Sequence, residues 1–421
     1  MAMLKRGVKR ALSRWAARNP RRVFAAQEAW LRIGNKWLDL QRAGWAIGRP
    51  EWLLHKSSNA PIAIAPDLPK NPERDREIAR RMIAVAKKAR EIGGAIDIPQ
   101  ETIWGSLLLV NFARLRALVE AGNETQLADF LGSVFRTETV NGFHYGTQLD
   151  ELPHQWAYLP INIELSVVTL AECLGILRTE QHEQGEVAYW RREFTEQSLM
   201  DALEAYFGFR IEAPSAGNPR GILFGGRFLT RETCSHLYSA HRMSRAIGQY
   251  GPAGELRIVE IGGGYGGTAY WLRRILGNRV ARYTIVDLPE VALLQTYFLG
   301  HVDPATVSMY GEAPLPGSTA TELVPHFHIS EINFRPNIVI NQDSMPEMPL
   351  SEVERYMDWI VGSADGLFLS YNQEAYSVWE GVPQIHVPTV AAQHPGLVRL
   401  ARETSWSRRG YVEEIYRLGA M

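Results

Sequence analysis

The stretch Arg257-Ile-Val-Glu-Ile-Gly-Gly-Gly-Tyr-Gly-Gly267 decides the fold, because an apolar β-branched run ends there in five glycines within six positions. The run has the composition of a buried strand, and a helical pattern follows it at about 265–277. Glycines permit positive φ and let a ligand approach the backbone where a Cβ would clash. The stretch therefore predicts a strand, a ligand-binding turn and a helix of a parallel sheet.

The sequence after this stretch continues the same alternation. From Glu255 onward, β-branched runs alternate with helical stretches, as in a mostly parallel sheet covered by helices on both faces. We expect strands at about 256–261, 282–287, 305–310, 337–341 and 364–371, helices at about 265–277, 289–300 and 351–361, and antiparallel edge strands at about 384–388 and 411–418. This half of the chain is predicted to be a Rossmann-like α/β domain.

The first half of the chain carries helical patterns instead, at about 73–92, 100–121, 161–178, 186–207 and 230–250. Ahead of them, residues 1–45 have the pattern of a basic amphipathic helix, and the Pro-rich stretch from Pro50 to Pro72 is typical of a linker. We predict three parts: a basic helical segment with its linker (1–72), a largely α-helical cap that binds the acceptor (73–250) and the Rossmann-like domain (251–421).

Composition excludes several classes of protein. The chain has 421 residues, of which 46% are hydrophobic and 22% charged, so wholesale disorder and fibrous repeats are excluded. A net charge of −1 argues against a protein that coats nucleic acid, and two cysteines are too few for a disulfide framework. No apolar run reaches the length of about 18 residues that a membrane span needs. We expect a cytoplasmic protein without a nucleic-acid partner, and the sequence leaves open whether it is a homo-oligomer.

The basic N-terminal helix leaves three interpretations open. It can pack on its own protein, lie on an anionic membrane surface or contact nucleic acid. In the second case the protein would lie peripherally at the inner face of a membrane.

Two acidic residues beside the glycine turn indicate an adenosine-containing ligand. Asp287 closes the next strand, Tyr283-Thr-Ile-Val-Asp-Leu-Pro-Glu290, where a carboxylate can accept both ribose hydroxyls. The glycine spacing alone also fits a dinucleotide. Glu260, two residues before Gly262, would repel a pyrophosphate and attract an ammonium group. The pattern therefore favours S-adenosylmethionine over NAD.

Val259–Gly267 together with Tyr283–Gln295 resembles class I S-adenosylmethionine-dependent methyltransferases. Together with a third motif, Asn341-Gln-Asp-Ser-Met-Pro-Glu-Met348, these two motifs resemble the sugar O-methyltransferase family. This resemblance covers roughly residues 225–375. The resemblance implies methylation of a sugar hydroxyl on a surface glycan, a lipid-linked saccharide or a glycosylated metabolite. The Asp-Leu-Pro element is shared with phenolic-type O-methyltransferases, so a phenol stays an alternative acceptor.

The same resemblance implies roles for individual residues in holding the cofactor. The methionine end is assigned to Glu260 and Gly262, the turn to Gly263, Gly264, Tyr265 and Gly266, the ribose to Asp287 and the adenine face to Leu288, with Asn341 as a further cofactor-binding candidate. For the adenine edge, Glu312 after the expected third strand is preferred and Glu331 is the alternative.

Methyl transfer to oxygen is an in-line displacement that needs a proton acceptor near the sulfur. Ligands of an open α/β sheet bind beyond the carboxyl ends of the strands, which points to Asn341–Met348. Asp343 is preferred as the proton acceptor, followed by Glu347 and then by His386 or His144, although Asp343 can instead cap the following turn. The candidates for holding hydroxyls of the acceptor are Asn372, Gln373, Glu374, His236 and Tyr145. Asp343, Glu347 and Glu374 could form a cluster around a divalent metal, but nothing in their spacing requires one, and no metal is predicted.

Two other functions compete with this interpretation. A nicotinamide-dependent oxidoreductase is disfavoured by Glu260. A non-catalytic scaffold that binds RNA or membranes is disfavoured by the intact glycine turn and by Asp287.

Overall fold

The computed structural model describes residues 67–92, 103–144, 146–147, 154–179, 190–302, 307–312, 320–374, 378–379, 382–408 and 410–419. All of these except residues 154–161 belong to one compact unit, which contains the sheet and the site described below. The predicted basic helix at 1–45 and most of the linker lie outside the described residues. No helix in the described part of the chain is long and apolar enough to span a membrane.

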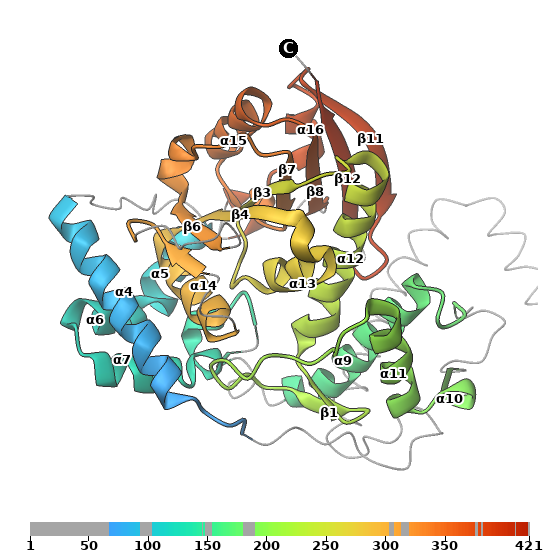
Figure 1. The fold of residues 1–421 in the computed structure, drawn as a ribbon, viewed down its shortest axis with the longest axis horizontal. Helices are drawn as coiled ribbons and strands as arrows, with labels where there is room; N and C mark the ends of the chain where they lie inside the picture. The colour runs from blue at the N-terminus through green and yellow to red at the C-terminus, as the bar shows by residue number, and fades with distance from the viewer. Residues whose placement is uncertain are drawn as a thin grey trace, which may run out of the picture. The chain divides into compact units, whose positions relative to one another are not determined.

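An eight-stranded sheet forms the centre of this unit (Figure 1). Its strands are β3 (Leu256–Ile261), β4 (Val280–Asp287), β5 (Val307–Met309), β6 (Thr321–Pro325), β7 (Ile338–Gln342), β8 (Leu367–Gln373), β11 (Leu397–Thr404) and β12 (Tyr411–Leu418). The order is β11-β12-β8-β7-β3-β4-β6-β5, and only β12 runs against the others. The strand order reverses between β3 and β7, which leaves a crevice at their carboxyl ends. The predicted Rossmann-like fold is confirmed.

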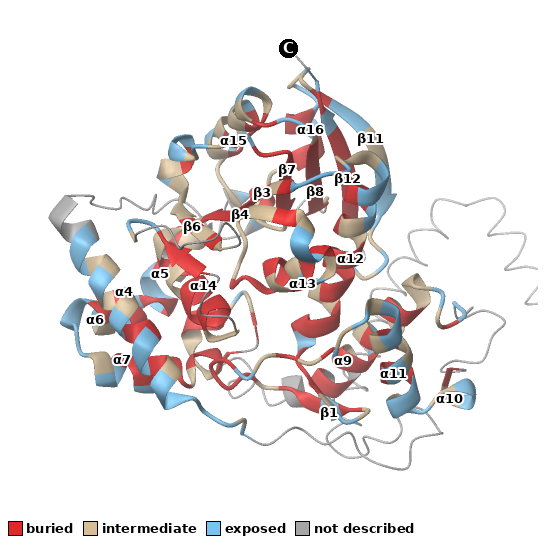
Figure 2. Cartoon of the chain, viewed as in Figure 1, coloured by how far each residue is buried: buried red, intermediate tan, exposed pale blue. Residues whose placement is uncertain are grey.

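Side chains of β3 alternate between the two faces of the sheet. Val259 and Ile261 point to the face covered by α15 (Leu350–Ser363) and α16 (Val387–Ala391), where they belong to one buried apolar core. Figure 2 shows the central strands as largely buried. Glu260, between these two residues, points to the opposite face, and this alternation brings an acidic side chain to the site.

The remaining elements confirm that the N-terminal part of the described chain is rich in helix. They are α4 (Pro72–Ile92), α5 (Ile103–Asn111), α6 (Ala113–Ala121), α7 (Glu124–Leu131), η1 (Val134–Arg136), η2 (Glu138–Val140), α9 (His154–Cys173), α10 (Trp190–Glu193), α11 (Glu196–Phe207), the hairpin of β1 (Ile222–Phe224) and β2 (Arg227–Leu229), and α12 (Arg231–Tyr250). After β3 come α13 (Gly267–Leu276), η3 (Gly277–Arg279), α14 (Pro289–Val302), η5 (His326–Glu331), η6 (Met345–Glu347) and the short pair β9 (Val378–Trp379) and β10 (Val382–Pro383).

A buried hydrogen-bond chain joins this helical part to the sheet. The Tyr297 hydroxyl of α14 donates to Asp75 Oδ1 of α4 at 2.8 Å and accepts from the Gly217 N–H at 3.0 Å. Asp75 is 3% exposed and Tyr297 is fully buried, so both polar groups depend on this contact. The helices before residue 140 are therefore packed onto the Rossmann-like part.

One predicted strand is wrong in kind, and two strands of the sheet, β6 and β11, were not predicted. The strand expected at 305–310 is confirmed as β5 at the edge of the sheet, and β6 pairs between it and β4. β6 has five residues, contains Glu322 and ends in Pro325, so it lacks the apolar run that predicts a buried strand. Residues 384–388 were expected as an edge strand, but α16 begins at Val387 with Pro388 in its first turn. β11 forms that edge instead.

Candidate functional site

The glycine turn joins the carboxyl end of β3 to the start of α13. Gly262 and Gly264 have φ of 72° and 55°, which side chains with a Cβ rarely adopt. The Gly262 N–H donates to Val286 O at 2.8 Å and ties the turn to β4. A Cβ on Gly262 would lie 2.0 Å from Ser344 Oγ. The turn after β7 therefore packs directly on the glycine turn.

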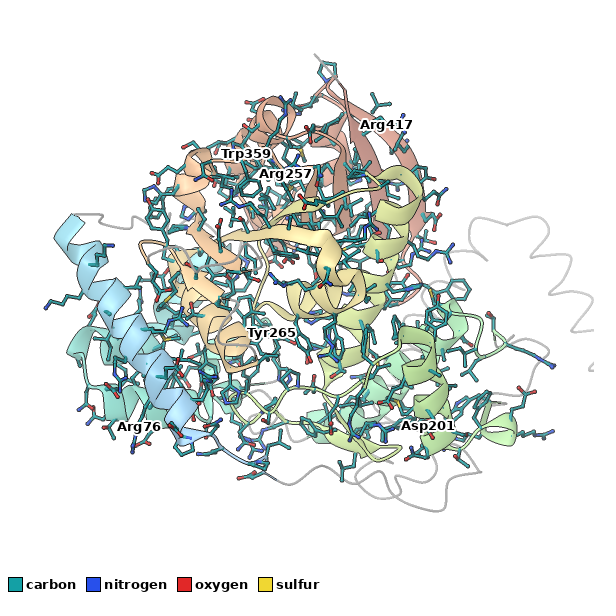
Figure 3. All side chains as sticks on the ribbon, viewed as in Figure 1. Arg76, Asp201, Arg257, Tyr265, Trp359 and Arg417 are labelled. Carbon is teal, nitrogen blue, oxygen red and sulfur yellow. The ribbon has the colours of Figure 1, made fainter. Side chains whose placement is uncertain are left out.

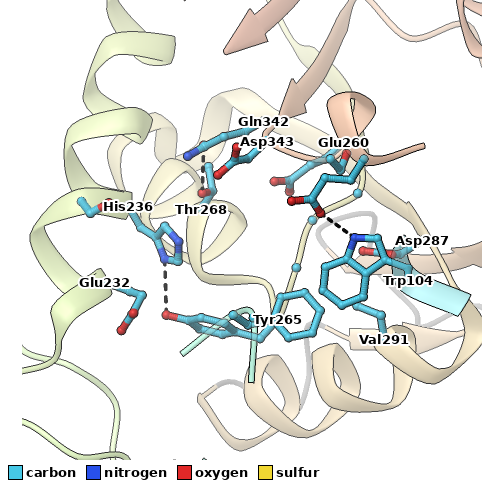
Figure 4. Close-up of a pocket in the computed structure, with 18 of the residues that line it drawn as sticks. Trp104, Glu232, His236, Glu260, Tyr265, Thr268, Asp287, Val291, Gln342 and Asp343 are labelled. Carbon is cyan, nitrogen blue, oxygen red and sulfur yellow. Dashed lines mark hydrogen bonds between the residues drawn. The ribbon is translucent and has the colours of Figure 1, made fainter. Parts of the chain in front are cut away.

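A cavity of about 630 Å³ opens beside these two turns (Figure 4). It is bounded by the ends of β3, β4 and β7, one face of α12, Trp104 of α5 and the turn between β11 and β12. Its charged side chains are Glu232, Glu260, Asp287, Asp343, Glu347, Glu352, Arg231 and Arg408. Among the described residues the wall is thus more acidic than basic, which favours a cationic ligand over a polyanionic one.

Glu260 lines the cavity from β3 and is 2% exposed. The Tyr283 hydroxyl donates to Glu260 Oε2 at 2.8 Å. Burial raises the pKa of Glu260 to about 7, and the hydrogen bond from Tyr283 only partly opposes this rise. Because this partner is neutral, a ligand cation would stabilise the ionised carboxylate.

Asp287 lines the cavity from the end of β4. Its Oδ1 accepts from the Leu288 N–H at 2.8 Å and its Oδ2 from the Gln295 amide at 2.7 Å. The Gln295 amide also donates to Gly264 O at 2.8 Å and so links the carboxylate to the glycine turn. Burial raises the pKa of Asp287 to about 7 against these hydrogen bonds.

The turn after β7 is shaped by two buried amides. Asn341 donates to Ile261 O at 2.9 Å and to Ser344 Oγ at 2.6 Å. Asn372 donates to Asn341 Oδ1 at 2.9 Å and accepts from the Asp343 N–H at 2.9 Å. Both asparagines are fully buried and neither lines the cavity. In this structure Asn341 and Asn372 hold the turn, and their predicted roles in binding the cofactor and the acceptor hydroxyls stay predictions.

Asp343 lines the cavity in a left-handed backbone conformation, with φ of 66°. Aspartate tolerates this conformation better than most residues, and such conformations cluster at functional sites. Its carboxylate forms an ion pair with Arg408, which comes from the turn between β11 and β12. The preferred proton acceptor of the sequence analysis therefore lies in the cavity but carries a basic partner.

Glu347 lines the same cavity and meets an aromatic pair. Trp104 Nε1 donates to Glu347 Oε2 at 2.6 Å, and the Trp104 ring stacks on Phe143 with 4.8 Å between centroids. Figure 4 draws this hydrogen bond of Trp104 as a dashed line. Burial raises the pKa of Glu347 to about 7, opposed by the Trp104 hydrogen bond, with Asp343 adding to the rise and Arg408 opposing it.

One face of α12 forms another wall of the cavity. Glu232 and His236, one helical turn apart, both line the cavity. Burial, with Arg408 and His144 nearby, lowers the pKa of His236 to about 3, so its imidazole is neutral at pH 7. His236 Nδ1 lies 3.3 Å from the Tyr265 hydroxyl (Figure 4).

Several predicted residues lie away from the cavity wall. His144 is buried behind it, with Nε2 3.0 Å from Glu232 Oε2. Glu312 follows β5 at the edge of the sheet and forms a two-point ion pair with Arg81, at 3.0 and 2.8 Å. The alternative, Glu331, accepts from Tyr310 at 2.5 Å.

The remaining candidates follow β8 or belong to the glycine turn. His386 Nε2 lies 3.2 Å from Glu374 Oε1, and Glu374 also pairs with Arg402. Gln373 bonds to Gln384, and the Cβ position of Gly266 meets Leu299 rather than the cavity. Gly263, Gly264, Tyr265 and Leu288 do line the cavity. Tyr145 lies outside the described residues.

The residues of the site that were missed from the sequence include Trp104, Arg408 and Glu232. Trp104 is 243 positions from its partner Glu347, and no local pattern reports such a contact. Glu232 did carry a signal, since it is four residues before His236 on a predicted helix. In the described part of the chain no group of three or more His, Cys, Asp or Glu side chains is arranged to hold a metal.

Similarity to known proteins is found among solved structures. No family model and no curated protein matches the sequence. The mitomycin 7-O-methyltransferase MmcR is 13% identical and covers 45% of this chain and 56% of its own, with a TM-score of 0.32. The pyocyanin biosynthetic protein PhzM is 10% identical over 45% of this chain and 56% of its own, with a TM-score of 0.33.

A third similar structure is the magnesium protoporphyrin IX methyltransferase of Synechocystis PCC 6803 with bound S-adenosylmethionine, 15% identical over 43% of this chain and 77% of its own, with a TM-score of 0.30. The chain thus spans just over half the length of the first two proteins. TM-scores this low carry no argument about activity, which rests on the cavity itself.

Proposed function

We propose that this protein is an S-adenosylmethionine-dependent O-methyltransferase that methylates a sugar hydroxyl. The observation that carries the proposal is the pair of buried carboxylates, Glu260 and Asp287, beside a glycine turn, each hydrogen-bonded by neutral partners. A ligand with an ammonium group, a sulfonium and ribose hydroxyls supplies the positive charge that these neutral partners do not, together with further hydrogen-bond donors. The phosphates of NAD would instead add negative charge to an acidic wall.

The described residues fit this cofactor. Glu260 would take the ammonium group, Asp287 the ribose hydroxyls, and Leu288 and Val291 offer apolar surface to the adenine. The Gly262–Gly264 backbone would lie against the methionine end. When bound, S-adenosylmethionine supplies a methyl group on a positively charged sulfur, which keeps the bonding electrons as the methyl leaves.

The sugar acceptor would lie between the turn after β7 and the helical wall. Two helices that line the cavity carry amide and hydroxyl side chains there, as sugar-binding sites do: Asn162, Ser166 and Thr169 on α9 and Ser235 on α12. The resemblance of the sequence to the sugar O-methyltransferase family supports the same acceptor class. A cavity of about 630 Å³ lies within the range of about 300–1,000 Å³ typical of small-molecule sites.

A labelled-methyl assay tests the proposal. The full chain is incubated with methyl-labelled S-adenosylmethionine and separate panels of free, nucleotide-linked and lipid-linked sugars, with simple phenols as the comparison. We expect label in a sugar fraction and none with Asp287→Ala. Label in phenols alone would show that the acceptor is a phenol and not a sugar. Failure to bind the cofactor would refute the proposal.

A further inference from the structure

The turn that holds Asp343 and Glu347 is in contact with the glycine turn. A Cβ on Gly262 would lie 2.0 Å from Ser344 Oγ and 3.8 Å from Met348 Cε, so residues on both sides of Glu347 pack against that backbone. Under the proposed function, the methyl group lies against the same backbone. Both carboxylates of this turn are therefore near the acceptor oxygen, and their partners decide which one can take its proton.

The two carboxylates have different partners. Asp343 is in an ion pair with Arg408, which occupies one of its carboxylate oxygens. Glu347 has a neutral partner, the Trp104 indole N–H, at 2.6 Å on Oε2. A carboxylate with one neutral donor keeps lone pairs for an acceptor hydroxyl.

Trp104 is suited to hold Glu347 in place through a proton transfer. The indole N–H only donates, so Trp104 neither takes the proton nor competes for it. Its ring is fixed by stacking on Phe143, with 4.8 Å between centroids and 22° between planes. Since α5 comes from the helical part of the chain, the contact also joins that part to the turn after β7.

The charged groups around Glu347 shift its pKa, each in a definite direction. Asp343, on the same turn, raises the pKa of Glu347, whereas Arg408, from the turn between β11 and β12, lowers it. Trp104 also lowers the pKa of Glu347, and burial sets it to about 7, near the working pH of a general base. Other titratable groups line the cavity from β3, β4, α15, η5 and α12: Glu260, Asp287, Glu352, His326, Glu232 and His236.

We infer that Glu347 takes the proton of the acceptor hydroxyl and that Trp104 is its positioning residue, an inference that rests on the proposed methyltransferase function. The acceptor oxygen would form the new C–O bond with its own electron pair and pass its proton to Glu347, whose carboxylate becomes a neutral carboxylic acid. Asp343, paired with Arg408, orients the acceptor and does not take the proton.

The first test needs no acceptor. Tryptophan emission of the full chain is titrated from pH 5 to 9, because protonation of a carboxylate hydrogen-bonded to an indole changes the emission of that indole. We expect a component with a midpoint near pH 7 that is absent from both Glu347→Gln and Trp104→Phe. The component should move to lower pH in Asp343→Asn and remain in Trp406→Phe, whose indole is exposed. A component that persists in Glu347→Gln, or no component at all, would overturn the inference.

The second test uses a sugar found in the labelled-methyl assay. Glu347→Gln should lower kcat by about 100-fold or more without changing the Kd of S-adenosylhomocysteine. Trp104→Phe should move the rising limb of the pH profile of kcat to higher pH, because the hydrogen bond that lowers the pKa of Glu347 is lost. If Asp343→Asn abolishes turnover while Glu347→Gln is active, Asp343 is the proton acceptor and the inference fails. Loss of cofactor binding by the wild-type protein would instead refute the proposed function.

Discussion

Asp287 is held beside the glycine turn by two neutral donors, the Leu288 N–H and the Gln295 amide. Its carboxylate can still accept the two ribose hydroxyls, and hydrogen bonds to a charged group contribute about 1.5–3 kcal/mol each. We therefore expect Asp287→Ala to weaken binding of S-adenosylhomocysteine by about 100-fold or more in calorimetric titration. The matched control is Asp358→Ala on α15, whose side chain is 80% exposed and which should bind normally. If the wild type and Asp287→Ala bind S-adenosylhomocysteine with equal affinity, Asp287 does not bind the ribose.

Glu260 gives a pH dependence of stability with a definite sign. Its pKa is about 7 in the folded protein and about 4 in an unfolded chain, so the folded state holds the proton more tightly. The free energy of unfolding therefore falls as the pH rises from about 4 to 7, by up to about 4 kcal/mol for this group. Glu260→Gln should remove this loss, and chemical denaturation at pH 5 and pH 8 measures it. If the free energy of unfolding of Glu260→Gln differs between pH 5 and pH 8 as much as that of the wild type does, the raised pKa of Glu260 is contradicted.

At the residue scale, the sequence predicts the groups that lie on one continuous motif. Glu260, Asp287 and the first three glycines, Gly262, Gly263 and Gly264, line the cavity because strand ends and turns set their places. The contacts of Trp104 with Glu347 and of Arg408 with Asp343 join residues 243 and 65 positions apart. Such contacts arise from tertiary packing, which no local pattern encodes.

At the scale of elements, the site depends on the close packing of the glycine turn after β3 against the turn after β7. A Cβ on Gly262 would lie 2.0 Å from Ser344 Oγ, at a φ of 72°. Gly262→Ala should force the turn after β7 away, at a cost of about 1–3 kcal/mol in stability, and abolish cofactor binding. Thermal unfolding and calorimetric titration measure the two effects.

Gly248 of α12 is the matched control for this change, because nothing lies within 4 Å of its Cβ position. Gly248→Ala lies inside a helix and should stabilise the protein by about 0.5–1 kcal/mol while binding is unchanged. If Gly262→Ala binds as well as Gly248→Ala, the two turns do not form the cofactor site together.

The elements also differ in how well the sequence predicts them. β3 and β4 have six and eight residues rich in apolar and β-branched side chains, and their positions were predicted closely. β6 has only five residues with a glutamate and a terminal proline, so it was missed. Short strands with polar residues at the side of a sheet lack the apolar run on which a strand prediction depends.

At the scale of the whole molecule, the hydrogen bonds of Tyr297 to Asp75 and Gly217 join the helical part to the sheet. Tyr297→Phe leaves two buried polar groups without this partner, so we expect a loss of about 1–3 kcal/mol in the free energy of unfolding. Because these parts belong to one compact unit, unfolding should stay a single transition by circular dichroism and by tryptophan emission. Two separate transitions would show that the helical part folds independently of the sheet.

The central claim is that a glycine turn flanked by two buried carboxylates binds a cationic adenosine cofactor. Calorimetric titration of the full chain with S-adenosylmethionine, S-adenosylhomocysteine and NAD tests it most directly. We predict binding of the first two at micromolar concentration and no heat with NAD. Binding of NAD alone, or of none of the three, would contradict the assignment of Glu260 and Asp287 and with it the proposed methyltransferase.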